Sequence, residues 1–321
     1  MPARSGRALG LLLGSVLDAA FADPRRGHPV AVFGRAATAL ERRLWADARA
    51  RGIVHSVLCT GTAGAAGGLL ERSTRGTRWH VAATAAATWA VLGGATLARE
   101  ATTQRRLLER SNLPAARAHL PSLCGRDPAG LGPAELARAA VESVAENTSD
   151  AVVAPLWWGA LAGMPGLLAY RAVNTLDAMV GHRGARYGRF GWAAARLDDV
   201  ANLAPARLTG LLAAVLAPAV GGSPAAAWRT MARDGAAHPS PNAGRCEAAF
   251  AGALGVRLGG TNVYGDRIER RGPLGEGRAP EPADIARAVR LSRLVGATAA
   301  VLAAAVAAAV AAVATRRGRA G

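Results

Sequence analysis

Residues Ala140 to Arg207 read AVESVAENTSDAVVAPLWWGALAGMPGLLAYRAVNTLDAMVGHRGARYGRFGWAAARLDDVANLAPAR. In this stretch acids, amides and arginines surround an apolar run, residues 151–170, which contains Pro155, Pro165 and several glycines. Such a run predicts a re-entrant or broken helix, which a membrane tolerates only where protein or water satisfies the backbone. Because polar side chains are unfavourable beside lipid, the polar groups gathered here mark a candidate functional site.

The composition of the whole chain favours a membrane protein. About half of the 321 residues are apolar, mostly Ala, Val and Leu, and aromatic residues make up only 4%. Small side chains suit closely packed membrane helices. We therefore expect an all-α fold, a polytopic membrane helical bundle with broken or re-entrant helices and cytoplasmic loops, which forms a single integral membrane domain over residues 1–321.

A helix needs about 20 apolar residues to cross the hydrocarbon layer. The uncharged run from Leu294 to Ala314 meets this length best. The first residues resemble a signal peptide, but Asp18 and Asp23 interrupt the region where a cleavage site should lie, so a retained first segment is expected. The candidate membrane segments are residues 8–22, 53–70, 81–98, 151–170, 203–220 and 294–314.

The distribution of arginine predicts the orientation. Residues 25–51 and 99–138 carry seven arginines each, against three in residues 72–78. By the positive-inside rule the two arginine-rich segments face the cytoplasm. We expect a multi-pass cell-membrane protein whose site faces the cytoplasm. A full crossing by residues 151–170 would place the polar groups before and after it on opposite faces, so this run is not expected to cross simply.

Charge and cysteine content exclude several classes of protein. The net charge is +17, but the chain has no lysine and its arginines are dispersed, which argues against nucleic-acid binding and excludes a P-loop. Cys59, Cys124 and Cys246 are too far apart to suggest a disulfide framework or a zinc site. Residues 273–282 are expected to form a surface loop before a helix that begins near Pro282 or Asp284.

Two groups of polar residues could carry chemistry. In a helix Glu142, Glu146 and Asp150 fall at i, i+4 and i+8, so they line one face, which is either solvated or occupied by a cation or an arginine. Oxygen ligands of this kind suit Mg²⁺. Later in the chain Asp199 and Asn202 form a compact oxygen pair that could bind a metal or an amine, although one acid there could instead cap a helix.

Five ordered motifs resemble the adenosylcobinamide-phosphate synthase family of cobalamin biosynthesis, whose members are integral membrane enzymes. The motifs are DPRRGHPVAVFGR at 23–35, ESVAENTSDAVVAPLWW at 142–158, YRAVNTLDAMVGHR at 170–183, YGRFGWAAARLDDVANLAPARLT at 187–209, and HPSPNAGRCEAAFAGALGVRLGG with NVYG between 238 and 265.

This resemblance implies an ATP-dependent amide ligase. Such an enzyme joins aminopropanol or its phosphate to a propionate side chain of the corrinoid adenosylcobyric acid, with ATP and Mg²⁺ required. ATP would convert the carboxylate into an acyl phosphate, which calls for cations around the phosphates. The amine must lose a proton before it attacks, which calls for a carboxylate or histidine base.

The resemblance does not say which residues are catalytic, but the polar residues of the chain can be assigned roles in such a reaction as a hypothesis. The expected catalytic residues are Glu142, Glu146, Asp150, Asp198 and Asp199, of which Glu142, Glu146 and Asp199 are the expected Mg²⁺ ligands. The expected substrate-binding residues are Asp23, His28, Arg35, Asn147, Arg171, Asn174, Asp177, Arg196, Asn202, Ser240, Asn242, Asn262 and Tyr264. Arg171 and Arg196 would contact phosphate, and Asn147, Asn174 and Asn242 would bind substrate amides.

Two other functions remain open at this point. A transporter for an ion or a cobalamin precursor would place its acids near the bilayer midplane, whereas the acids here gather at the ends of the segments. A membrane scaffold for other enzymes would leave the acid-rich segments without a purpose. The sequence leaves open whether the protein is a homo-oligomer.

Overall fold

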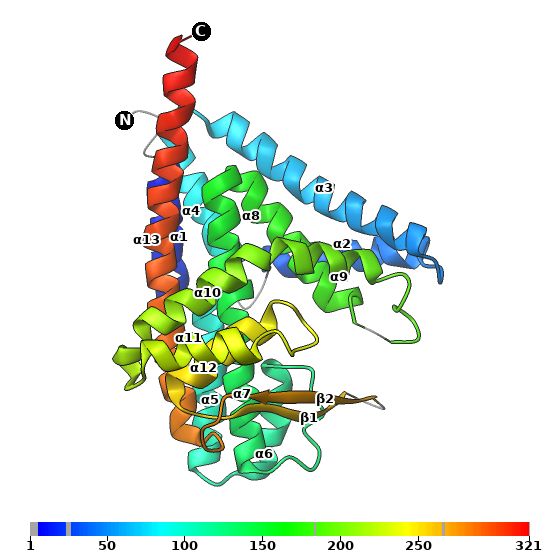
Figure 1. Ribbon diagram of the computed structural model, residues 1–321. Helices are drawn as coiled ribbons and strands as arrows, with labels where there is room; N and C mark the ends of the chain where they lie inside the picture. The colour runs from blue at the N-terminus through cyan, green and yellow to red at the C-terminus, as the bar shows by residue number, and fades with distance from the viewer. Residues whose placement is uncertain (1–5, 24–26, 183, 265–266, 321) are drawn as a thin grey trace. The chain divides into compact units, whose positions relative to one another are not determined.

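The computed structural model describes residues 6–23, 27–182, 184–264 and 267–320, with only the backbone described for residues 263, 264, 267 and 314–320. The fold is mostly helical, as predicted (Figure 1). The chain divides into two compact units. The first consists of Met1–Gly93, Ala154–Asn202 and Ala299–Gly321, and the second of Gly94–Val153 and Leu203–Thr298.

The first unit contains only helices among its described residues. They are α1 (Gly6–Phe21), α2 (Pro29–Leu44), α3 (Arg49–Thr74), α4 (Trp79–Val91), α8 (Ala154–Val180), α9 (Trp192–Ala201) and the later part of α13 (Pro282–Ala320). Close helix packing depends on small residues. In α1, Gly10 and Gly14 lie against Thr84 and Thr88 of α4, where a Cβ on either glycine would meet threonine Cβ atoms at 2.5 and 2.4 Å.

Helix α8 is bent sharply at Gly163, which has the non-helical backbone angles φ 67° and ψ −149° (Figure 1). A Cβ built on Gly166 would lie 2.3 Å from the carbonyl oxygen of Trp158. Residues eight apart in a straight helix are separated by about 12 Å along the axis. The two arms of α8 therefore fold back on each other, which confirms the predicted break within residues 151–170.

A buried ion pair holds this bend. The side chain of Glu71 on α3 accepts a hydrogen bond from the backbone N–H of Met164 at 2.9 Å, at the start of the second arm of α8. Arg7 donates to the same carboxylate at 2.7 Å. A carboxylate at a helix N-terminus satisfies free N–H groups and interacts favourably with the helix dipole. Glu71 thus acts as a cap supplied by a different helix.

The second unit combines helices with one β-hairpin. Its helices are α5 (Gly94–Glu109), α6 (Leu113–His119), η1 (Leu120–Ser122), α7 (Pro133–Thr148), the π-helical turn η2 (Ser149–Val153), α10 (Leu203–Leu216), η3 (Ala217–Val220), α11 (Pro224–Asp234), α12 (Ala243–Leu254) and the first part of α13. The antiparallel strands β1 (Leu258–Tyr264) and β2 (Arg267–Leu274) lie beside α12 (Figure 1). This hairpin is not among the elements predicted from the sequence. Helix α13 begins at Pro282, as expected.

Among the described residues, five helical segments are long and apolar enough to cross a membrane. They are Arg49–Thr74, Trp79–Glu109, Pro133–Val180, Leu203–Val220 and Pro282–Val313. These contain the predicted segments 53–70, 81–98, 151–170 and 203–220, and all but the last residue of 294–314. The predicted segment 8–22 corresponds to α1, which has 16 residues and falls short of the roughly 20 that a crossing needs.

Candidate active site

The acids of the ESVAENTSD motif lie at the end of α7. Glu142 is buried with 3% exposure, and Glu146 lies one turn later and is half-buried. Asp150 falls in the π-helical turn η2, so it departs from the regular i, i+4, i+8 face that the sequence predicted. π-helical turns of this kind are frequent at functional sites.

Glu142 is surrounded by donors within the second unit. Arg126 lies 2.5 Å from Oε2, and Arg138, one turn earlier on α7, lies 3.3 Å from Oε1. The backbone N–H of Gly259 donates to Oε1 at 2.8 Å. A buried carboxylate with this many charge-assisted hydrogen bonds is fully satisfied. Glu142 therefore holds Arg126, Arg138 and the backbone of Gly259 in place.

The β-hairpin reaches this cluster through a bulge in β1. Gly259 and Gly260 have φ angles of 82° and 94°, a conformation that favours glycine. The bulge turns the carbonyl of Gly259 toward Arg138, which donates to it and also to Oδ1 of Asn262 at 3.1 Å. Asn262, a predicted substrate-binding residue, is 1% exposed, and its Nδ2 has no hydrogen-bond partner among the described residues.

Glu247 on α12 is the most deeply buried acid of the cluster, with 0% exposure. Neither of its carboxylate oxygens has a hydrogen-bond partner among the described residues. The closest basic groups are Arg271 of β2, with Nη1 at 3.6 Å from Oε1, and the imidazole of His238, with Nε2 at 3.8 Å. An unsatisfied buried carboxylate is unfavourable, and such groups are rare outside functional sites.

Burial shifts the pKa of both Glu247 and His238 toward their neutral forms. Desolvation raises the pKa of Glu247 well above its ordinary value, and the charges of Glu142 and Glu146 raise it further, against the opposing effect of Arg271. Desolvation and the charge of Arg271 lower the pKa of His238 to about 4. Two adjacent groups with strongly shifted pKa values are typical of a catalytic site.

Several polar residues of the later motifs have structural contacts. Ser240 accepts hydrogen bonds through Oγ from the N–H groups of Asn242 and Ala243, and so shapes the turn into α12. Asn242 is 6% exposed and accepts from Arg207 at 3.4 Å. Asn147 donates to the carbonyl of Ser143 on its own helix at 3.0 Å. The turn made by Ser240 places His238 next to α12.

A second polar cluster lies in the first unit, where α8 packs against α9. Asp198 accepts from Nδ2 of Asn174 at 3.4 Å and from Nδ2 of Asn202 at 3.0 Å. Tyr170 donates to Oδ1 of Asn202 at 2.8 Å. Desolvation and the nearby charge of Asp177 raise the pKa of Asp198 to about 7. The structure thus brings together four residues that the sequence proposed for the site: Asn174, Asp177, Asp198 and Asn202.

The other predicted residues of the first unit lie outside the cluster around Asp198 or make contacts that stabilise the local structure. Arg196 and Asp199 form an ion pair at 2.9 Å in which the Arg196 side chain is 56% exposed. His28 accepts from the N–H of Val30 and caps α2, while its Nε2 lies 3.3 Å from Asp23.

Three more predicted residues lie on α8, α2 and β1. Arg171 donates to Asn174 at 3.4 Å. Arg35 is exposed on α2. Tyr264 belongs to β1, but its side chain lies outside the described part of the structure.

The predicted acids are divided between the two units. Glu142, Glu146 and Asp150 belong to the second, and Asp198 and Asp199 to the first. Their union in one site stays a prediction, as does Mg²⁺ binding by Glu142, Glu146 and Asp199. Among the described residues, no group of three or more His, Cys, Asp or Glu side chains is arranged to hold a metal ion.

Four residues of the cluster are not among those predicted from the sequence: Glu247, Arg126, Arg138 and Arg271. Glu247 had a usable signal, because it is the lone charge within the run CEAAFAGALG, and an isolated acid among small apolar residues is often functional. The sequence gives no comparable signal for the arginines, because their partners are distant in the chain. Arg138, for example, donates to Asn262, which lies 124 positions later.

Comparison with known proteins agrees with the motifs. The family described as CobD/Cbib protein matches residues 11–292. A cobalamin biosynthesis protein CobD from Mycobacterium tuberculosis is 59% identical over 92% of this chain and 94% of its own length. Proteins of the same name from Geobacter metallireducens and Chromobacterium violaceum are 48% and 40% identical, each over 88% of this chain and 91% of their own length. No solved structure matches the chain.

Proposed function

The chain belongs to the CobD/Cbib family of cobalamin biosynthesis proteins, and on that premise we propose that it is an ATP-dependent acid–amine ligase. Its substrates would be adenosylcobyric acid, a corrinoid, and aminopropanol or aminopropanol phosphate. The product would be an amide at a propionate side chain of the corrin ring. The observation that carries this proposal is Glu247, a fully buried carboxylate whose oxygens have no hydrogen-bond partner among the described residues.

The proposed reaction has two steps. The terminal phosphoryl group of ATP is transferred to the propionate oxygen, which gives an acyl phosphate and ADP. The amine nitrogen then attacks the acyl carbon, so a C–N bond forms while the C–O bond to phosphate breaks. An alkyl amine carries a proton at neutral pH, since its pKa is near that of lysine, about 10. It must give up one proton before the attack and another as the amide forms.

Glu247 is suited to accept the first of these protons. Without substrate the side chain favours its neutral form, but the positive charge of a bound ammonium group would favour loss of that proton to solvent, and the resulting buried carboxylate is a stronger base than an exposed glutamate. The second proton leaves with the phosphate as hydrogen phosphate, which balances the step. Arg271, within 3.6 Å of Glu247, supplies positive charge for the acyl phosphate beside the same carboxylate.

Magnesium that accompanies ATP would neutralise charge on the phosphates. Glu142 does not fit as its ligand, because its oxygens already accept from Arg126, Arg138 and Gly259. Glu146 fits better, because it is half-buried one turn away on the same helix. One or two carboxylates together with phosphate oxygens are the usual ligands of Mg²⁺.

The direct test uses the full chain in membranes or detergent. It is incubated with adenosylcobyric acid, ATP, Mg²⁺ and either aminopropanol or aminopropanol phosphate, and the corrinoid products are measured by mass spectrometry. We expect an amide that depends on ATP, with a higher rate for one of the two amines. Absence of the amide with both amines would overturn the proposal.

A further inference from the structure

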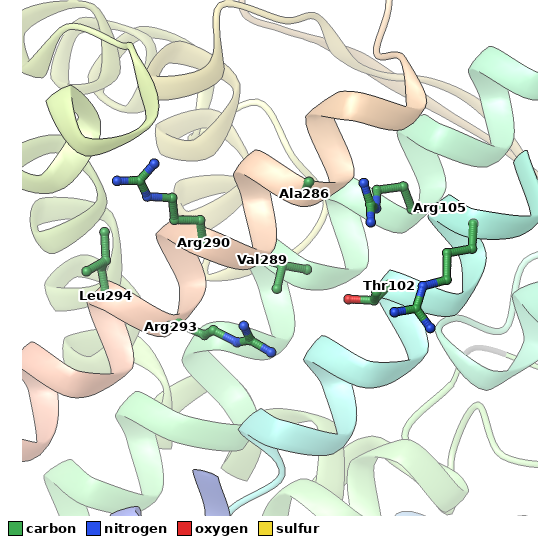
Figure 2. Close-up of a pocket in the computed structure, with 8 residues that line it drawn as sticks. Thr102, Arg105, Ala286, Val289, Arg290, Arg293 and Leu294 are labelled. Atoms are coloured by element: carbon green, nitrogen blue, oxygen red, sulfur yellow. The ribbon is translucent and has the colours of Figure 1, made fainter. Parts of the chain in front are cut away.

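A pocket of about 680 Å³ lies between α5 and α13 in the second unit (Figure 2). Four of its eight lining residues are arginines: Arg105 and Arg106 on α5, and Arg290 and Arg293 on α13. Figure 2 shows the guanidinium group of Arg293 pointing toward Thr102 on the facing helix. Among the described residues, no acid lines this pocket. It is therefore a strongly positive hollow between two helices.

Most of this positive charge is not neutralised by the protein. Arg105 forms an ion pair with Glu109 at 3.0 Å. Arg106, Arg290 and Arg293 are exposed, and no ion pair or hydrogen bond joins them to another side chain in the described part of the chain. Guanidinium groups bind phosphate oxygens in pairs, and a cluster of them favours an anionic ligand.

The position of the pocket along its helices suggests the source of the anion. Arg293 directly precedes Leu294 and Arg290 lies about one turn earlier, and after Leu294 α13 carries no charge until Arg316. On the other wall, Arg105 and Arg106 lie near the end of the candidate membrane segment Trp79–Glu109. Both pairs of arginines therefore lie at the end of an apolar segment, next to polar residues. This is the level of lipid head groups if the two helices cross the membrane.

We propose that this pocket binds the phosphate group of an anionic phospholipid. Basic pockets between membrane helices recognise such head groups. The apolar side chains of Val289 and Leu294 line the same pocket and would contact the first part of an acyl chain. The lipid site is independent of the proposed ligase reaction, because it lies on α5 and α13 and shares no residue with the Glu247 cluster.

The test measures phosphatidylglycerol binding to the full chain in neutral detergent by native mass spectrometry. The test variant is Arg290→Gln with Arg293→Gln. The matched control is Arg42→Gln with Arg43→Gln, which removes two exposed arginines from the last turn of α2. A third variant, Arg290→Lys with Arg293→Lys, keeps the charge. Each arginine near a lipid surface contributes about fivefold in affinity, so the test variant should bind about 30-fold more weakly.

The expected pattern is one tightly bound lipid in the wild type, the control and the lysine variant, and weak binding in the glutamine variant alone. Equal binding by the glutamine variant and the wild type would overturn the proposal. A competition experiment distinguishes the source of the phosphate. If millimolar inorganic phosphate or ATP displaces phosphatidylglycerol, the pocket is a site for soluble phosphate and the lipid assignment is wrong.

Discussion

His238 and Glu247 face each other in the buried part of the second unit, with Nε2 of the histidine 3.8 Å from Oε1 of the glutamate. Neither of these two atoms has a hydrogen-bond partner among the described residues. Burial lowers the pKa of the histidine and raises that of the glutamate, so both favour their neutral forms. The positive charge of an ammonium group bound beside them would favour the ionised form of Glu247, which could then accept a proton from that group.

The shifted pKa of His238 predicts sensitivity to acid. Unfolded histidine has a pKa near 6.5, whereas folded His238 has one of about 4, so the unfolded state binds more protons in this range and stability falls as pH decreases. We expect about 2 kcal/mol of unfolding free energy to be lost between pH 7 and pH 5 through this residue. His238→Asn, which keeps an acceptor for the N–H of Ser240, should lack that loss. An identical loss in the variant and the wild type, measured by chemical unfolding, would contradict the assignment.

The raised pKa of Asp198 predicts that stability depends on pH in the opposite direction. Its folded pKa of about 7 lies above the ordinary value of 3.8, so the folded state keeps a proton that the unfolded state releases. Stability from this group is present below pH 4 and is lost as pH rises toward 8. Asp198→Asn should therefore gain stability relative to the wild type between pH 5 and pH 8. Parallel stability curves for the two proteins would show that Asp198 is an ordinary ionised aspartate.

The cap on the second arm of α8 predicts a large loss of stability when it is removed. Glu71→Ala leaves Arg7 without its carboxylate and the N–H of Met164 without its acceptor, and breaking a buried pair typically costs about 3–5 kcal/mol. Arg75→Gln is the matched control, because Arg75 pairs with the same carboxylate but its side chain is 66% exposed. An exposed pair contributes about 1 kcal/mol or less. Thermal unfolding in detergent should separate the two variants, and equal melting temperatures would be evidence against the cap.

The bend at Gly163 predicts that only glycine is tolerated there. An alanine would place its Cβ 2.1 Å from Oε2 of Glu71 in a backbone conformation with φ of 67°. The backbone strain alone costs about 1–2 kcal/mol. Gly61→Ala in α3 is the control, because no described atom lies within 4 Å of its Cβ and a helix-interior alanine should stabilise by about 0.5–1 kcal/mol. The two substitutions should shift the melting temperature in opposite directions, and a stable Gly163→Ala protein would refute this explanation of the bend.

The sequence predicts the helical parts of this fold well, because the signals are local. Gly163 and Pro165 indicate the break in α8, and Pro282 indicates the start of α13. Asn174 and Asp198 could be assigned to one site from their motifs, and the packing of α8 against α9 brings them together. The predicted membrane segment 8–22 stays a prediction, because its helix α1 has only 16 residues in the described part of the chain.

The parts that the sequence could not predict depend on distant contacts. The β-hairpin is formed by a glycine-rich segment and a charged one, with none of the alternating apolar pattern that marks a strand. Its bulge at Gly259 binds Glu142 and Arg138, residues more than a hundred positions earlier. Glu247 is catalytically interesting only because α12 buries it beside His238 and Arg271. None of these contacts can be predicted from a short stretch of sequence.

The most direct test of the central claim compares Glu247→Gln with Glu276→Gln, a control at an acid whose side chain is 81% exposed. Each variant is given adenosylcobyric acid, ATP, Mg²⁺ and the preferred amine, and both amide formation and hydroxylamine-trapped acyl phosphate are measured. Loss of a general base typically slows a reaction by about 100-fold or more. We predict that Glu247→Gln still forms the acyl phosphate but makes amide at least about 100-fold more slowly, whereas Glu276→Gln matches the wild type. Amide formation by Glu247→Gln at the wild-type rate would contradict the assignment of Glu247 as the proton acceptor.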